Sequence, residues 1–237
     1  MKLIRSFLFN IYYVLTTLFF CLTGLLAGIL PRQVRSFNAR LWGKSLLFGL
    51  RWIVGIKCEV RGRENLPADG RYIVASKHQS ALETIAFHAI LPSPAYILKK
   101  ELLYIPLFGW NLLLTGCVAI DRSSGTKAMR SILQGSEKRL KENRPVIIFP
   151  EGTRTAPGAT TRYNPGVGLL YEKCGVPVIP TALNSGYFWR KKAFLKDPGT
   201  IIVEFLPAMP QGLDKREFIG ELQNRIEEAC RKINPNE

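Results

Sequence analysis

The chain has 237 residues, of which 47% are hydrophobic and 22% are charged. This balance excludes an intrinsically disordered chain and suits one substantial core with an appendage. An excess of Lys and Arg (33) over Asp and Glu (18) gives a net charge of +15, which indicates an anionic partner: lipid headgroups, nucleic acid, an acidic protein or a phosphorylated substrate.

The N-terminal region contains no charged residue between Ser6 and Pro31. A helix of about 20 apolar residues crosses a bilayer, and this run is longer than that. It is also longer than the apolar core of a signal peptide and lacks a clear small-residue cleavage site. We therefore expect a retained membrane anchor.

Positive charge flanks this anchor unequally, with more cations after it than before it. The difference favours a cytoplasmic location for the rest of the chain. Gly24 and Gly28 leave a second arrangement open, in which the segment bends and forms a hairpin within one leaflet. The flanking cations are Lys2 and Arg5 before the segment, and Arg32, Arg35, Arg40 and Lys44 after it.

The stretch from residue 40 to residue 56 has the pattern of an amphipathic helix. Arg40, Lys44 and Arg51 fall on one side at 100° per residue, and apolar side chains cover most of the rest. This pattern favours a helix in the membrane interface over a core helix with three exposed cations. We therefore divide the chain into membrane-anchoring and interfacial helices at 1–56 and an α/β domain at 57–237.

Short apolar runs alternate with helical patterns beyond residue 56. Such alternation predicts an α/β fold with a mixed, largely parallel sheet flanked by helices on both faces. The expected strands lie at 71–76, 95–100, 117–121, 145–149, 176–183 and 200–206. The expected helices lie at 81–91, 101–114, 125–142, 166–174 and 215–233.

The segment "KHQSALETIAF" places His78 at a strand end and Glu83 at the start of a helix. One interpretation is structural: Ser80 and Glu83 fit the capping box that satisfies free N–H groups at a helix start. The other is catalytic: Glu83 fixes the tautomer of His78 and makes it a general base. Both roles use the same carboxylate oxygens, so we expect one of them to dominate.

Cations follow three other expected strands. Arg122 follows "CVAI", Arg154 lies in "FPEGTR", and Lys99 and Lys100 end "AYILKK". Guanidinium groups suit phosphate oxygens, and Gly152 allows backbone amides to approach an anion or an oxyanion closely. Because catalytic groups gather where strands end in such sheets, these residues predict a phosphate site beside His78.

Four motifs, "HQSALE", "GCVAIDR", "FPEGTR" and "VPVIPTA", occur in the order and spacing of the four blocks of the glycerolipid acyltransferase superfamily. The chain resembles its bacterial 1-acylglycerol-3-phosphate acyltransferases over residues 56 to 210. The resemblance implies that His78 is the catalytic base and Glu83 its supporting acid. It further implies a substrate-phosphate site formed by Arg122, Glu151, Gly152, Thr153 and Arg154 with Lys99 or Lys100. The fourth block, around Pro177 and Pro180, is associated in this family with acyl-donor binding or with the shape of the site.

The first block departs from the usual Asn-His-x-x-x-x-Asp pattern, since Lys77 precedes the histidine and Glu83 replaces the aspartate. A glutamate keeps the charge but is one methylene longer. This difference affects the His–acid geometry more than the activity that the resemblance implies.

The resemblance implies transfer of a fatty acyl group from acyl-CoA or acyl carrier protein to 1-acylglycerol 3-phosphate. It further implies the bacterial inner membrane, with the catalytic domain facing the cytoplasm. Expected partners are lysophosphatidic acid, the acyl thioester, an anionic membrane surface and an acidic carrier protein, and not nucleic acid. The alternatives are another lysolipid or glycerol 3-phosphate as acceptor, or a non-catalytic protein that binds anionic membranes.

No cofactor is expected, because transfer from a thioester needs none. The five cysteines are scattered, with no Cys-x-x-Cys pair and no spacing typical of zinc ligands. We therefore expect free thiols in a reducing compartment and no metal site.

Overall fold

The computed structural model describes residues 1–235, in which seven strands form one sheet in the order β1-β7-β6-β2-β5-β3-β4. Neighbouring strands are parallel except for β6 and β7, which are antiparallel. The expected mixed, largely parallel α/β fold is confirmed. The strands are β1 (Ile56–Arg61), β2 (Ile73–Ser76), β3 (Ala95–Lys99), β4 (Val118–Ile120), β5 (Val146–Ile148), β6 (Val178–Leu183) and β7 (Gly199–Phe205).

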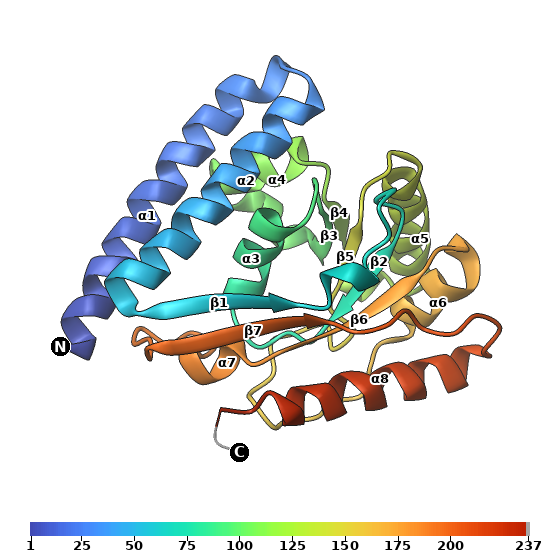
Figure 1. Cartoon of the computed structure of the whole chain (residues 1–237). Helices are drawn as coiled ribbons and strands as arrows, with labels where there is room; N and C mark the ends of the chain where they lie inside the picture. Colours follow the sequence, from blue (N-terminus) through green and yellow to red (C-terminus); the bar gives the residue numbers. More distant parts are fainter. Residues whose placement is uncertain (236–237) are drawn as a thin grey trace.

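Helices cover both faces of this sheet (Figure 1). Helices α5, α6 and α8 pack on one face, and α3 and α4 on the other, with α1 and α2 outside α3. The α-helices are α1 (Lys2–Leu26), α2 (Arg32–Gly49), α3 (Leu82–Ile90), α4 (Phe108–Leu114), α5 (Thr126–Lys141), α6 (Pro165–Cys174), α7 (Ser185–Phe188) and α8 (Lys215–Lys232). Shorter helical turns are η1 (Ala27–Ile29), η2 (Leu50–Val54), η3 (Arg63–Asn65), η4 (Lys100–Tyr104) and η5 (Arg122–Ser124).

The side-chain patterns explain these positions. Every residue of β2, β5 and β6 is buried, as expected for central strands covered on both faces. On α8, Phe218, Leu222 and Ile226 recur every four residues and face the core. Asp214 caps this helix by accepting hydrogen bonds from the amides of Arg216 and Glu217.

Two expected elements differ in the structure. The strand β1 begins at Ile56, where we expected a helix to end, and its alternating exposure explains why no apolar run marks it. The helix expected at 101–114 is divided into η4 and α4. Pro106 lies between the two and has no amide hydrogen, so a continuous helix would lack a hydrogen bond there.

Helices α1 and α2 form an antiparallel hairpin along the side of the α/β domain (Figure 1). The helix that we expected at 40–56 begins at Arg32 and ends in the π-helical turn η2. It approaches α3 so closely that a Cβ atom on Gly43 would lie 2.8 Å from the Ile85 carbonyl oxygen. The interfacial helix and the domain boundary at residue 56 stay predictions.

By length and composition, Lys2–Ile29 is a candidate membrane span, with only 17% of its most apolar window buried. Both ends of α1 nevertheless contact the α/β domain. Lys2 forms an ion pair with Asp197, and the Asn111 amide donates a 2.9 Å hydrogen bond to the carbonyl oxygen of Cys21. The helix therefore lies across the domain and does not project away from it.

Candidate active site

The turn between β2 and α3 brings His78 and Glu83 together. The Nδ1 atom of His78 lies 3.0 Å from Oε2 of Glu83, whose side chain is fully buried. The same carboxylate accepts hydrogen bonds from the Ser80 amide at 2.9 and 3.0 Å and from the Ser185 hydroxyl. Glu83 thus serves the helix start and the histidine at once, so our expectation that one role would dominate is wrong.

This contact defines the tautomer of His78. A carboxylate accepts hydrogen bonds, so the neutral imidazole carries its proton on Nδ1 and leaves the lone pair on Nε2. The ring stacks on Phe149 with centroids 3.9 Å apart and an interplanar angle of 17°. Two independent contacts therefore fix the orientation of the ring.

The carboxylate of Glu151 supports the backbone of the same turn. Its Oε2 accepts a 2.7 Å hydrogen bond from the His78 amide, and its Oε1 accepts one of 2.6 Å from the Thr155 hydroxyl. Lys77, which is 1% exposed, lies 2.9 Å from Glu151 and 2.6 Å from Glu227 in α8. These contacts lie within the protein, and a role for Glu151 at the substrate phosphate stays a prediction.

The other residues of the third block form a loop beside His78. Gly152 has φ +71°, and a Cβ atom there would lie 2.7 Å from the Asn164 amide nitrogen, so glycine suits this turn on both counts. The Gly152 carbonyl oxygen accepts a hydrogen bond from Arg122, and its amide donates one of 2.9 Å to Phe149. The amide of Gly152 itself is therefore occupied, and the oxyanion role expected for backbone amides near Gly152 stays a prediction.

Thr153 and Arg154 continue this loop, and a further cation contacts it. Lys191 Nζ lies 3.3 Å from the Thr153 hydroxyl and donates a 3.0 Å hydrogen bond to the Arg154 carbonyl oxygen. No motif marks Lys191 in the sequence, because it follows α7 far from the third block.

The two lysines at the end of β3 have different surroundings. Lys99 lines the cavity beside His78 and pairs with Glu101 at 3.1 Å. Lys100 is not among the lining residues and pairs with Asp121. The bond to Lys100, followed by those to Ser123, lowers the pKa of Asp121 to about 2. Of the two candidates, the structure brings only Lys99 to the cavity.

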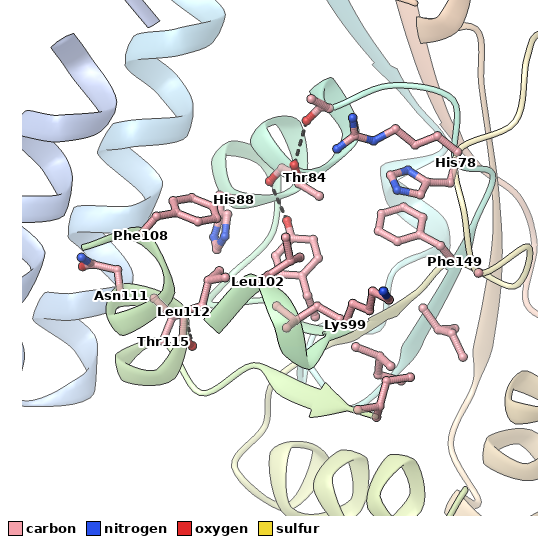
Figure 2. Close-up of a pocket in the computed structure, with 18 of the residues that line it drawn as sticks. His78, Thr84, His88, Lys99, Leu102, Phe108, Asn111, Leu112, Thr115 and Phe149 are labelled. Atoms are coloured by element: carbon pink, nitrogen blue, oxygen red, sulfur yellow. Dashed lines mark hydrogen bonds between the residues drawn. The ribbon is translucent and has the colours of Figure 1, made fainter. Parts of the chain in front are cut away.

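These groups share one cavity of about 800 Å³. Its charged end contains His78, Lys99, Arg122, Thr153 and Arg154. From there the cavity extends between α3, β3 and α4 to an apolar wall provided by Tyr13, Phe20 and Trp42 of α1 and α2. Figure 2 shows this arrangement, with His78 and Phe149 at one side and Phe108, Asn111 and Thr115 at the other.

A second histidine, His88, lines the apolar arm of the cavity. Its ring lies 4.9 Å from the ring of Tyr96 and 5.7 Å from that of Trp42. Burial, and then the nearby Arg144 guanidinium, lower the pKa of His88 to about 4. His88 is therefore neutral at physiological pH and adds no charge to this arm.

The fourth block lies outside the lining of the cavity. Pro177 and Pro180 of the fourth block contribute carbonyl oxygens to hydrogen bonds within the sheet, with Ile73 and Leu206.

Within residues 1–235, no three His, Cys, Asp or Glu side chains gather as a metal site would require. The absence of a cofactor stays a prediction.

Comparisons with known proteins identify the family of this chain. The acyltransferase family model matches residues 57–184. A 1-acyl-sn-glycerol-3-phosphate acyltransferase from Pseudomonas aeruginosa is 37% identical over 219 residues, which cover 90% of this chain and 85% of that protein. The chain belongs to the acyltransferase family.

A more distant relative supports the same grouping, and a solved structure supports the fold. A 1-acyl-sn-glycerol-3-phosphate acyltransferase from Saccharomyces cerevisiae is 29% identical over 95% of this chain and 77% of its own length. The crystal structure of the 1-acyl-sn-glycerophosphate acyltransferase PlsC from Thermotoga maritima superposes with a TM-score of 0.82 at 22% identity, over 98% of both chains. Membership of this family favours an acyltransferase over the non-catalytic membrane-binding alternative.

Proposed function

We propose that this acyltransferase moves a fatty acyl group from acyl-CoA or acyl carrier protein to the free hydroxyl of 1-acylglycerol 3-phosphate, giving phosphatidic acid. One observation carries the proposal: the His78–Glu83 pair lies at the cationic end of a cavity whose other arm is lined mainly by apolar side chains, with Arg35 and Asn38 among them. Such a cavity suits a substrate with a phosphate at one end and an acyl chain at the other. The names of the bacterial and yeast relatives agree with it.

The proposed reaction is direct acyl transfer. Nε2 of His78 takes the proton of the acceptor hydroxyl as its oxygen attacks the thioester carbonyl carbon. Collapse of the tetrahedral intermediate breaks the carbon–sulfur bond, and the thiolate leaves with the proton from the imidazolium. Glu83 stabilises the imidazolium between these steps. The reaction is balanced with two substrates alone, so no cofactor or metal is proposed.

The phosphate of the acceptor is proposed to bind Arg122, Arg154 and Lys99, which supply positive charge beside His78. Lys191 is added to this group because it contacts the Thr153–Arg154 loop. Holding the phosphate at this point sets the distance of the acceptor hydroxyl from the base, which is the source of the proximity effect.

Membrane association follows from the same proposal, since acceptor and product are lipids. Exposed apolar side chains occur along α1, α2 and the following turn η2, including Phe7, Leu15, Phe37, Phe48 and Trp52. Because both ends of α1 contact the α/β domain, we favour the hairpin within one leaflet over a span. We place this leaflet on the cytoplasmic side of the bacterial inner membrane, as the flanking cations predict.

An acyl-transfer assay tests the proposal directly. The purified protein in vesicles is given lysophosphatidic acid, lysophosphatidylcholine, monoacylglycerol or glycerol 3-phosphate, each with acyl-CoA and with acyl carrier protein. We expect lysophosphatidic acid to give the highest kcat/KM, because monoacylglycerol leaves the cations without a partner. Equal turnover of monoacylglycerol would contradict the phosphate site, and preference for glycerol 3-phosphate would assign a different acceptor.

A further inference from the structure

A second cavity, of about 530 Å³, opens beside the turn between α1 and α2. It lies where the start of α2 meets the ends of α4 and α5, away from His78. Its charged lining consists of Arg32, Arg35, Arg139, Arg144 and a single carboxylate, Glu142. We call it the arginine pocket. Four cations surround one anion, so the pocket has a strong excess of positive charge.

The one carboxylate of the arginine pocket is already shared. Arg139 Nη1 lies 2.8 and 3.0 Å from the two oxygens of Glu142, and Arg32 and Arg144 each lie 3.4 Å from Oε2. Burial opposes ionisation of Glu142, but Arg139 and then Arg144 leave its pKa lowered. Glu142 is thus fully charged at neutral pH and still neutralises only one of the four arginines.

Backbone carbonyl oxygens accept some of the remaining guanidinium hydrogen bonds: Arg35 donates to Gly28 and Leu30, and Arg144 donates to Ser93, Pro94 and Thr115. The Nε atoms of Arg35 and Arg139 are buried and have no hydrogen-bond partner within the described chain. Most buried polar groups in proteins do have such a partner. The side chain of Arg144 is only 3% exposed, and burial, followed by repulsion from Arg139, lowers its pKa. An additional anion in the pocket would accept hydrogen bonds from the unpartnered guanidinium groups and would stabilise the buried charge of Arg144.

Leu113 and Leu114 of α4 line the pocket, and further apolar side chains are exposed on the elements that contribute to it. Ile29, Leu30 and Val34 are exposed at the turn of the hairpin, and Trp110 and Leu113 are exposed on α4. Arginines next to exposed apolar and aromatic side chains are typical of a surface at the level of lipid headgroups. Free phosphate in solution would need no such apolar surround.

We propose that the arginine pocket binds the phosphate of an anionic phospholipid headgroup at the membrane surface. The pocket adjoins the cavity of His78 through Arg35 and Leu114, but His78, Lys99, Arg122 and Arg154 are not among its lining residues. Guanidinium forks bind phosphate oxygens in pairs, and four of them supply more donors than Glu142 accepts. The acyl chains of the lipid would lie along the apolar residues of the hairpin turn and α4. The proposal does not depend on the acyl-transfer reaction, because it concerns binding alone.

The test compares two double variants of the full chain. Arg32→Gln with Arg139→Gln removes one pocket arginine from each of α2 and α5. Arg40→Gln with Arg130→Gln removes exposed arginines of the same two helices that line neither cavity. Both variants lose the same charge. Arg35 is left unchanged because it also lines the catalytic cavity.

Binding is measured with phosphatidylcholine vesicles that contain or lack phosphatidylglycerol, at low and high salt. Phosphatidylglycerol is neither substrate nor product of the proposed reaction. We expect the pocket variant to bind phosphatidylglycerol vesicles at least about tenfold more weakly than the control variant, because it loses charge-assisted hydrogen bonds. The difference should persist at high salt, which screens general attraction to the surface.

Equal weakening in the two variants would overturn the proposal, since it would leave only general surface charge. Inorganic phosphate that binds the native protein and competes fully with the vesicles would overturn the lipid assignment. Thermal unfolding and acyl transfer in detergent check that both variants are folded. If the pocket double variant does not fold, Arg32→Gln alone, with its side chain 37% exposed, is compared with Arg40→Gln by the same criterion.

Discussion

Lys77 and Glu227, which are 150 residues apart in the sequence, form a 2.6 Å ion pair next to the turn between β2 and α3. Lys77 also pairs with Glu151, and Glu151 accepts the hydrogen bond of the His78 amide. Although burial lowers it, Glu151 and Glu227 leave the pKa of Lys77 raised, so the lysine remains charged. Helix α8 is thereby connected through buried charges to the backbone of the proposed base.

We predict that Lys77→Met destabilises the protein by about 3–5 kcal/mol, because it leaves buried carboxylates without their cation. Urea unfolding in detergent measures the change. Lys232→Met is the matched control, since Lys232 forms an exposed pair with Glu228 on the same helix and should change stability by less than about 1 kcal/mol. Similar losses in the two variants would contradict a structural role for the buried pair.

We predict that Lys99→Gln raises the KM for lysophosphatidic acid by about tenfold or more, because it removes a charge-assisted contact with the phosphate. Lys100→Gln should have a much smaller effect, since Lys100 pairs with Asp121 outside the cavity lining. Steady-state kinetics of the two variants in vesicles provide the comparison. A larger effect at Lys100 would transfer the phosphate contact to that residue.

We predict that the protein becomes less stable as the pH falls, because His88 must take up a proton on unfolding. Its pKa is about 4 in the folded protein against 6.5 for an ordinary histidine, so the folded state binds fewer protons between these values. Stability is therefore lost as the pH falls through this window, by about 2 kcal/mol at pH 5 relative to pH 7.5. Urea unfolding at the two pH values measures the loss, and His88→Leu should remove most of it. An unchanged pH dependence in His88→Leu would assign it to other groups.

The sequence predicts the elements whose burial is regular. The stripe of Phe218, Leu222 and Ile226 predicts α8, and the continuous apolar run 145–149 predicts β5. By contrast, β1 is an edge strand that is half exposed, so its residues show no apolar run. The break before α4 depends on Pro106 alone, and the helical pattern on both sides of this proline predicts one continuous helix.

The sequence predicts the site residues that lie at the ends of strands, but not the later residues that contact them. His78 and Glu83 lie close in the sequence, so a strand–turn–helix model brings them together. Ser185 of α7 contacts Glu83, and Glu227 of α8 contacts Lys77. Patterns in a single sequence do not predict contacts between residues so far apart in the chain. The arginine pocket is hidden for the same reason, because its cations come from α2, α5 and the loop after α5.

The proposal that His78 is the general base is tested most directly by measuring acyl transfer to lysophosphatidic acid by His78→Ala in vesicles. We predict a fall in kcat of at least about 100-fold, because the proposed general base is lost. Vesicle binding should stay unchanged, because His78 lies in the cavity and not on the membrane-facing helices. Thermal unfolding checks that the variant is folded, since the substitution removes the ring contact with Phe149 and one donor to the buried Glu83 carboxylate. Turnover close to that of the native protein would contradict the account.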